Sequence, residues 1–532
     1  MGVSLSTIRL RLLITLAMFA VGAGLAGAAL AIAKPPTGGT FRIGHSGGSP
    51  FIDFALTSPF GETGEVASLT CLTLLNFNDA ARQRLVPEAA AGYPKVSKDG
   101  RTYTFRIRRG LRFSNGQRVT AETFAFTINR TLEVGQYAAS LLGDVVGADE
   151  VVEGKAKTAS GIRARGSTLA IALKEPAPDF PVRTFSFGFC AVPIGLPIDP
   201  EGVPAPIHQA GPYYIASWVR DRRIVLERNR FYHGRRPHHV ARFVITYGLE
   251  PETIVPSIER GSLEGGDVPA SESARLAKRY GVNRSQYFAK PTPLVYSVAL
   301  NAERGLFRDA RARRAVNFAV DRRGLVRAGE RLASAGPRFG ANWGTPTDQW
   351  LPPGLGGRDA KIYPLTGNRA KARALLRGAG GTRRVAIYTR AEEPFLTWAQ
   401  LIERSLRGVG LRVTTKSFPV SVLFDKLGTP GEPWDLALVG AYGADYPDPS
   451  SQLALFSGPP IPRKYLRRFH RAERLLGKAR YRAFGNLDVA LSRDVAPSIP
   501  FAALNAKTFV SKRVGCKVLN PGLDLAAACL KR

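Results

Sequence analysis

The chain has 532 residues, of which 44% are hydrophobic and 22% charged, and this composition excludes wholesale disorder. Four cysteines exclude a disulfide-dense miniprotein, and a polytopic membrane protein is excluded because only one uncharged stretch, at the N-terminus, could span a bilayer. Lys and Arg number 75 against 42 Asp and Glu, giving a net charge of +33 that is spread along the chain instead of forming one nucleic-acid-binding arm.

Residues 1–33 have the pattern of an export signal. Arg9 and Arg11 precede an uncharged run that ends in Ala-Ile-Ala, as in secretory signal peptides. The run is 22 residues long, so an uncleaved membrane anchor is the alternative, whereas the lack of a cysteine near the cleavage point argues against a lipid anchor. We therefore expect an exported protein, periplasmic or extracellular and associated with the cell envelope, with a mature charge of 33 − 2 = +31.

Export makes disulfides favourable for the four cysteines, which can pair in three ways. Cys516 and Cys529 would close a short loop in the C-terminal tail, and Cys71 with Cys190 would then close a long one. Two disulfides are the favoured prediction, and four buried thiols are the alternative.

The first half of the chain predicts several short strands and one capped helix. A strand is expected over 40–44, and a second follows the Asp99-Gly100 turn with alternating apolar residues at 103–107. Thr120 is placed to cap a helix in which Phe124 and later apolar residues recur every four positions. Further strands are expected at the apolar runs 213–215, 224–226 and 243–245.

The second half continues this alternation. A strand is expected over 294–300, followed by a helix capped by Asp309, then a helix from Asn368 to Gly378 and a strand at 385–388. Because helices and strands alternate without internal repeats, the sequence predicts α/β lobes with mixed sheets.

Two motifs suggest chemistry but have better structural interpretations. Ser46 lies in a G-x-S-x-G pattern, yet it follows the first mature strand, and the glycines after it are poorly suited to begin the helix that a nucleophile elbow requires. A turn is therefore favoured over a serine hydrolase. His233, His238 and His239 cluster around Arg235 and Arg236, which would repel a cation, so neither a metal nor a cofactor is expected.

The basic stretch 462–482 is interleaved with aromatic residues, a mixture that can bind nucleic acid. The apolar residues have helical spacing, at Leu466, Phe469, Ala472 and Leu476. This spacing predicts that they face a core and that the charged side chains are exposed to solvent. Export also argues against a nucleic-acid partner.

One acidic loop stands out, at 442–449, directly after the strand-like run 434–439. Asp445 and Asp448 lie there between Tyr442 and Tyr446, so a carboxylate could hold a ligand ammonium group beside aromatic rings. The alternative is that both aspartates cap turns.

Taken together, these motifs resemble the extracellular solute-binding proteins of family 5, the peptide- and nickel-binding receptors of ATP-driven importers. The resemblance covers essentially the whole mature chain and is carried by ordered blocks at 39–44, 99–126, 301 with 307–321, and 434–436 with 444–449, together with 211–213.

The resemblance implies a periplasmic-binding-protein-like clamp with two lobes, a discontinuous lobe I and an additional α/β domain. The limits expected from it are a signal peptide at 1–33, lobe I at 34–76, 200–292 and 490–532 (the last including the tail), the additional domain at 77–199, and lobe III at 293–489.

The resemblance also implies a function without enzymatic activity. The protein would capture peptides or similar amine-bearing solutes between its lobes by hinge closure and deliver them to a membrane permease. Asp445 matches the position that holds the peptide amine, Ala441 and Gly443 match the backbone that pairs with the peptide, and Tyr442 and Tyr446 flank them. A nickel complex or a sugar is the alternative ligand. A monomer is expected, and the charge suggests electrostatic association with an anionic envelope.

Overall fold

The computed structural model describes residues 35–49, 51–56, 62–80, 84–199, 201–332, 342–357, 361–456 and 461–531. Residues 37–532 belong to one compact unit, to which every statement below refers. The export signal predicted at 1–33 lies outside the described residues and stays a prediction. Within the described ranges, no helix has both the length and the apolar character needed to cross a bilayer.

A mixed twelve-stranded sheet forms the framework, and its continuous path contains ten strands. The order along that path is β15 (Arg412–Phe418), β14 (Arg384–Arg390), β16 (Leu436–Leu438), β12 (Tyr287–Leu300), β18 (Ser498–Val510), β11 (Gly265–Gly266), β1 (Thr40–Gly44), β10 (Arg242–Thr246), β9 (Arg223–Arg228) and β8 (Tyr213–Val219). Two more strands leave the path: β13 (Gly344–Pro346) pairs with β18, and β17 (Ala441–Gly443) pairs with β12. Parallel pairs such as β1–β10 and antiparallel pairs such as β12–β18 confirm the expected mixed sheet.

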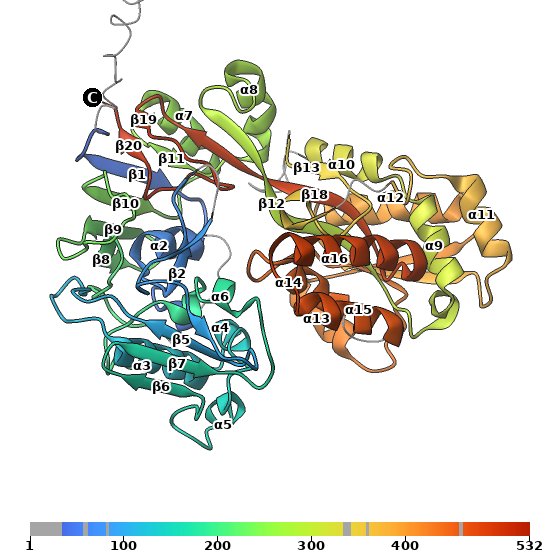
Figure 1. Cartoon of the computed structure of the whole chain (residues 1–532). Coiled ribbons are helices and arrows are strands. Elements are labelled where there is room, and N and C mark those ends of the chain that lie inside the picture. Colours follow the sequence, from blue (N-terminus) through green and yellow to red (C-terminus); the bar gives the residue numbers. More distant parts are fainter. Residues whose placement is uncertain are drawn as a thin grey trace, which may run out of the picture. The chain divides into compact units, whose positions relative to one another are not determined.

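Strands β12 and β18 are the longest of the described strands and connect separate hydrophobic cores (Figure 1). Phe288 and Val510 belong to the core around β1 and β8–β10, whereas Val298 and Phe501 belong to the core around β14–β16. The register of the pair shifts in its middle, between Pro291 and Val295. The two strands therefore link the cores through an irregular central segment.

A third core lies under a four-stranded antiparallel sheet. This sheet has the order β4 (Lys95–Val96), β5 (Thr102–Arg106), β7 (Thr168–Ala172) and β6 (Ile162–Arg165). Helix α3 (Ala121–Val134) buries Phe124, Ile128 and Leu132 in this core. Its start is a capping box between Thr120 and Thr123, which confirms the helix and the cap predicted from the sequence.

The other helices and small strands surround these cores. The helices are α2 (Glu62–Thr70), α4 (Tyr137–Ser140), α5 (Ala148–Val152), α6 (Phe180–Arg183), α7 (Pro251–Arg260), α8 (Ala270–Tyr280), α9 (Ala310–Ala319), α10 (Arg322–Arg331), α11 (Arg369–Arg377), α12 (Phe395–Arg407), α13 (Val420–Gly428), α14 (Pro449–Leu453), α15 (Arg463–Glu473) and α16 (Gly477–Ala490). Two-stranded sheets join β2 (Leu75–Phe77) to β3 (Leu85–Pro87) and β19 (Val514–Gly515) to β20 (Cys529–Leu530). Asp309 and Asn368 cap α9 and α11 as predicted.

The single apolar face predicted for 462–482 is wrong at its end. Phe469 and Ala472 are buried and Leu466 is half-buried, but Leu476 is 71% exposed. The chain leaves the helical path between α15 and α16, where Gly477 has a φ of 52°. The four-residue repeat is broken there, so Leu476 projects away from the core.

All four cysteines form disulfides. Cys71 pairs with Cys190 across 119 residues, and Cys516 pairs with Cys529 across 13. The first disulfide lies in the core around β1, and the second closes the tail beside the β19–β20 pair. The favoured cysteine pairing is therefore present in the structure.

Candidate functional site

The acidic loop predicted from the sequence follows strand β17. This strand pairs antiparallel with β12, matching Ala441 to Tyr296 and Gly443 to Leu294. Among the described strands β12 is its only partner, so the opposite backbone edge of β17 has no strand beside it. A Cβ at Gly443 would come within 2.4 Å of Leu294 Cδ2, so any larger residue here would require the Leu294 side chain to move.

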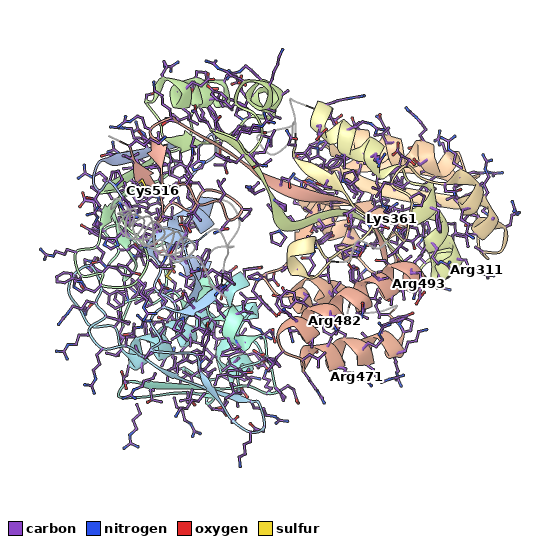
Figure 2. All side chains as sticks on the ribbon, turned by 45° about the horizontal axis from the view of Figure 1, so that its top comes forward. Arg311, Lys361, Arg471, Arg482, Arg493 and Cys516 are labelled. Carbon is purple, nitrogen blue, oxygen red and sulfur yellow. A yellow bond between two sulfur atoms is a disulfide. The ribbon has the colours of Figure 1, made fainter. Side chains whose placement is uncertain are left out.

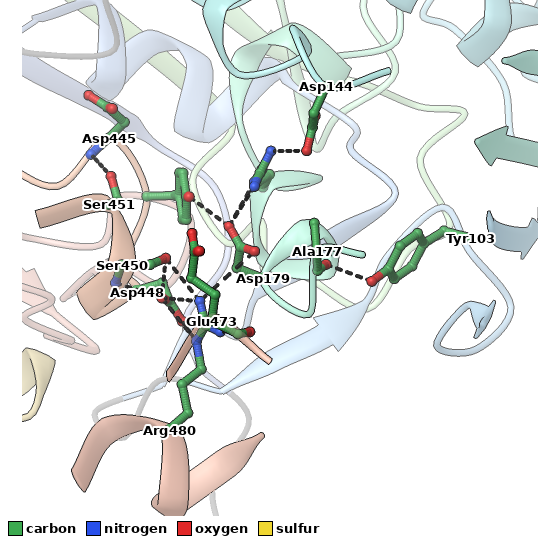
Figure 3. Close-up of polar contacts among 12 residues, drawn as sticks. Tyr103, Asp144, Ala177, Asp179, Asp445, Asp448, Ser450, Ser451, Glu473 and Arg480 are labelled. Atoms are coloured by element: carbon green, nitrogen blue, oxygen red, sulfur yellow. Dashed lines mark hydrogen bonds and ion pairs between the residues drawn. The ribbon is translucent and has the colours of Figure 1, made fainter. Parts of the chain in front are cut away.

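Asp445 is half-buried just beyond this edge. Its backbone N–H donates to Ser451 Oγ over 2.9 Å (Figure 3), and its Oδ1 accepts a hydrogen bond from the hydroxyl of Tyr137 on α4. Burial raises the pKa of Tyr137, and the Asp445 carboxylate raises it further. Two segments 308 residues apart therefore meet at this carboxylate.

Tyr446 makes the second contact between these segments. Its hydroxyl donates to Asp179 Oδ2 over 2.7 Å, and its ring lies 5.5 Å from the guanidinium carbon of Arg183. Arg183 also pairs with Asp179, at 2.8 Å. Burial alone would raise the pKa of Asp179, but Arg183 and the Tyr446 hydroxyl outweigh it and lower the pKa below the ordinary value. Asp179 is thus a carboxylate held in its charged form.

Asp448 has a structural role, as the turn-capping alternative predicts. It accepts the backbone N–H of Ser450 at 2.9 Å to cap α14, and Arg480 of α16 binds both of its oxygens at 2.8 and 2.9 Å. Arg480 also lies 3.9 Å from Asp179, so the ion pair extends to the other segment (Figure 3). The two aspartates of the loop therefore differ: Asp448 is buried and paired, whereas Asp445 is the more accessible carboxylate.

Tyr442 gives this edge an aromatic wall. Its ring centroid lies 5.9 Å from that of Trp350, and its side chain is half-buried. The structure thus gathers Ala441, Tyr442, Gly443 and Asp445 at one strand edge, while the hydroxyl of Tyr446 is directed to Asp179. The role of these five residues in ligand binding stays a prediction.

Sequence reasoning missed Tyr137, Asp179 and Arg480. None lies in a recognisable motif, and each reaches the loop from a distant segment. The local signal closest to Asp179 is its spacing of four residues from Arg183, which marks an ion pair on α6 but not the contact with Tyr446.

The serine-hydrolase alternative fails at Ser46. Its Oγ donates to Asp267 Oδ2 at 3.0 Å, and the histidine beside it, His45, bonds Asp267 at 2.9 Å and Glu65 at 2.7 Å instead of Ser46. Burial lowers the pKa of His45, but the two carboxylates more than offset this and raise it to about 10. A protonated histidine without a contact to the serine is not its general base. Nor is there a helix in the described residues 47–49 and 51–53 that follow Ser46.

The described residues contain no group of three or more His, Cys, Asp or Glu side chains placed to hold a metal ion. A cavity of about 570 Å³ lies beside the central part of β12 and β18, where Pro291, Tyr363 and Asn505 line it. Asp445 does not line this cavity, so the predicted site and the cavity are separate features of the structure.

Two long strands pass between distinct α/β cores, and candidate ligand groups lie at an edge strand. This arrangement is that of a two-lobed binding-protein fold. The model of the bacterial extracellular solute-binding proteins, family 5 (middle), matches residues 84–461. The chain belongs to this family, which confirms the resemblance inferred from the sequence.

Individual relatives agree with this assignment. The chain is 29% identical over 255 residues to Protein XP55 of Streptomyces lividans (46% of this chain, 42% of that protein) and 26% identical over 243 residues to the periplasmic oligopeptide-binding protein OppA of Escherichia coli K12 (42% and 43%). It thus spans less than half the length of these two curated relatives.

Two solved structures share the fold over nearly their whole length. The clavulanic acid biosynthesis oligopeptide binding protein 2 superposes with a TM-score of 0.80 at 22% identity, covering 93% of this chain and 96% of that one. Haemophilus influenzae OppA in complex with the peptide RPPGFSPFR gives 0.68 at 20% identity, covering 93% and 99%. These similarities confirm the predicted periplasmic-binding-protein-like fold.

Proposed function

We propose that this protein is the exported substrate-binding protein of an ABC importer, and that it captures peptides or similar amine-bearing solutes and delivers them to a membrane permease without changing them chemically. The observation that carries the proposal is the accessible Asp445 carboxylate beside the unpaired edge of β17. Family membership and the oligopeptide-binding relatives support it.

The chemistry of this edge suits the start of an extended peptide. Ala441 and Gly443 offer backbone groups for strand addition, which binds a peptide without reading its side chains. Asp445 supplies one charge for the ammonium group, and a charge-assisted hydrogen bond is about twice as strong as a neutral one. Affinity would therefore depend on the free amine more than on the sequence of the peptide.

We further propose that the cores correspond to the lobes: lobe I at 34–76, 200–292 and 490–532, the additional domain at 77–199, and lobe III at 293–489. Three separate hydrophobic clusters support a division into three parts, with Phe501 of 490–532 packed in the lobe III cluster and Leu72 of 34–76 in that of the additional domain. The β12–β18 pair would be the hinge, because its register is interrupted between the cores. Closure would bring the additional domain against lobe III through Tyr137 and Asp179.

The test is the Asp445→Asn substitution, which removes the charge and keeps the shape. Binding is measured by native mass spectrometry with a randomised tetrapeptide library in free-amine and N-acetylated forms. We expect the free-amine library to lose about ten- to hundredfold in affinity, the equivalent of one charged hydrogen bond, and the acetylated library to change little.

Asp425→Asn on α13 is the matched control, because Asp425 is exposed and makes no side-chain hydrogen bond or ion pair within the described residues. Equal losses for the two libraries would contradict the amine-anchor role of Asp445. Failure of the wild-type protein to bind either library would contradict a peptide receptor altogether.

A further inference from the structure

The outer face of α15 and α16 is strongly basic. Its eight exposed cations are Arg463, Lys464, Arg467, Arg468, Arg471, Arg474, Lys478 and Arg482. The only acidic side chain between residues 463 and 482 is Glu473, and it bonds His470 at 2.9 Å. Within the described parts of the chain, none of the eight cations forms an ion pair with a carboxylate. We refer to these eight residues as the basic face.

The basic face is built on a well-packed pair of helices. Tyr465, Phe469 and Ala472 of α15 are buried on one side, which leaves the cations on the other. Arg471 on α15 and Arg482 on α16 lie on neighbouring helices in Figure 2. Because the helices are fixed by their own core, the basic face is a rigid array of charge and not a mobile tail.

Mutual repulsion of unpaired like charges destabilises such an array, so a bound external anion would stabilise it. Some other exposed cations are balanced by carboxylates of the chain itself. On α9 and α10, for instance, Arg311 pairs with Asp309 and Arg327 with Asp321. The basic face combines eight exposed cations on two adjacent helices, and none of them is ion-paired in the described structure.

The exposed Leu476 indicates which anion fits. It lies in the turn between α15 and α16, next to Arg474 and Lys478, and is the most exposed of the large hydrophobic residues in the described structure, at 71%. A soluble polyanion offers no apolar phase for this side chain. A bilayer offers phosphate groups to the cations and an acyl boundary to the leucine.

We propose that the basic face binds an anionic phospholipid surface, with the cations at the headgroups and Leu476 entering the interface. The attraction is electrostatic at long range and screened by salt, and the leucine adds a short-range contact that salt does not weaken. This membrane binding does not depend on which solute the proposed ligand site captures.

The test is co-sedimentation of the exported protein, purified from cells that express the full chain, with two kinds of vesicle: pure phosphatidylcholine, and phosphatidylcholine mixed with phosphatidylglycerol. We expect binding to the mixed vesicles only, decreasing as salt is added. The variant Arg467→Gln/Arg471→Gln/Arg474→Gln/Lys478→Gln is expected to reduce partitioning about a hundredfold or more, as four contacts near an anionic surface imply.

The matched control neutralises four other exposed cations, Arg369→Gln/Lys371→Gln/Arg377→Gln/Arg404→Gln, on α11 and α12. It makes the same change in net charge with the same residue types, and we expect it to keep most of the binding. Equal losses for both variants would overturn the proposal, because overall charge and not this face would then be responsible. Thermal denaturation establishes that both variants are folded.

Leu476→Gln separates a membrane from a soluble polyanion. We expect it to weaken vesicle binding several-fold while leaving retention on a heparin column unchanged, because only a bilayer contacts the leucine. Unchanged vesicle binding would overturn the assignment of the basic face to a membrane and indicate a soluble polyanion. Vesicle binding that does not decrease with added salt would also contradict the proposed electrostatic binding to phospholipid.

Discussion

Tyr446→Phe tests whether the contact between the additional domain and lobe III supports ligand capture. The substitution keeps the aromatic ring beside Asp445 and removes only the hydroxyl that donates to Asp179 at 2.7 Å. Asp179 remains paired with Arg183 at 2.8 Å, so no charge is left buried without a partner. The change therefore removes one contact between segments 267 residues apart, together with the local hydrogen bond between the hydroxyl and Ser450.

The magnitude follows from the type of bond. A hydrogen bond to a charged group contributes about 1.5–3 kcal/mol, and the lower end applies here because Arg183 continues to neutralise Asp179. If the bond forms only when the lobes close over ligand, about 1.5 kcal/mol of closed-state stability is lost. That loss corresponds to a roughly tenfold weaker affinity. The effect should be the same for free-amine and N-acetylated peptides, because the hydroxyl is bonded to Asp179 and not to the proposed amine anchor Asp445.

Native mass spectrometry with both tetrapeptide libraries gives the affinities, and small-angle scattering with and without peptide reports closure. Tyr465→Phe is the control, because its hydroxyl makes a similar bond to Asp494, at 2.8 Å, that does not involve residues 77–199. An unchanged affinity in Tyr446→Phe, or an equal loss in Tyr465→Phe, would refute the idea that this contact stabilises the closed form.

Two further predictions concern stability. Replacing Cys71 and Cys190 by alanine should lower the free energy of unfolding by about 5 kcal/mol, and replacing Cys516 and Cys529 should lower it by about 3 kcal/mol. The difference is expected because the entropy lost by the unfolded chain grows with the separation of the two cysteines, which is 119 and 13 residues. The reverse order in urea denaturation would contradict this model. Because the pKa of His45 is raised from 6.5 to about 10, its stabilising effect should be complete below pH 6.5 and disappear as the pH rises through about 10. The difference in urea midpoint between wild type and His45→Gln should narrow over that window, and a constant difference would argue against a charged His45.

Local patterns predicted what depends on local interactions. Thr120 was identifiable as a cap because the hydrogen bonds of a capping box join residues three apart, and the structure contains that box. Strand β1 was equally clear from its alternation and the loop that follows it. The cysteine pairing could be favoured because only three arrangements exist for four cysteines. In each case the sequence allowed few alternative local structures or pairings.

Contacts across the chain could not be predicted in this way. Tyr137 lies on a helix of four residues without a motif, and its bond to Asp445 spans 308 positions. Asp179 has the spacing of an ordinary helical ion pair with Arg183, and nothing in that spacing indicates Tyr446. The exposed Leu476 was missed because a helical repeat was extended through a turn. Such errors arise wherever tertiary structure decides which side of a segment is buried.

Helix α16 shows how the proposed ligand site and the basic face can coexist without interfering. Lys478 and Arg482 lie four residues apart on the exposed side, whereas Arg480, about 200° around the helix from Lys478, is buried with only 4% of its side chain exposed. Arg480 binds Asp448 next to the predicted site, and the outer cations have no part in that ion pair. Neutralising the outer side therefore leaves the support of the acidic loop intact, and an Asp445 variant leaves the basic face unchanged. Membrane attachment and solute capture are then separable by substitution, although one helix contributes to both.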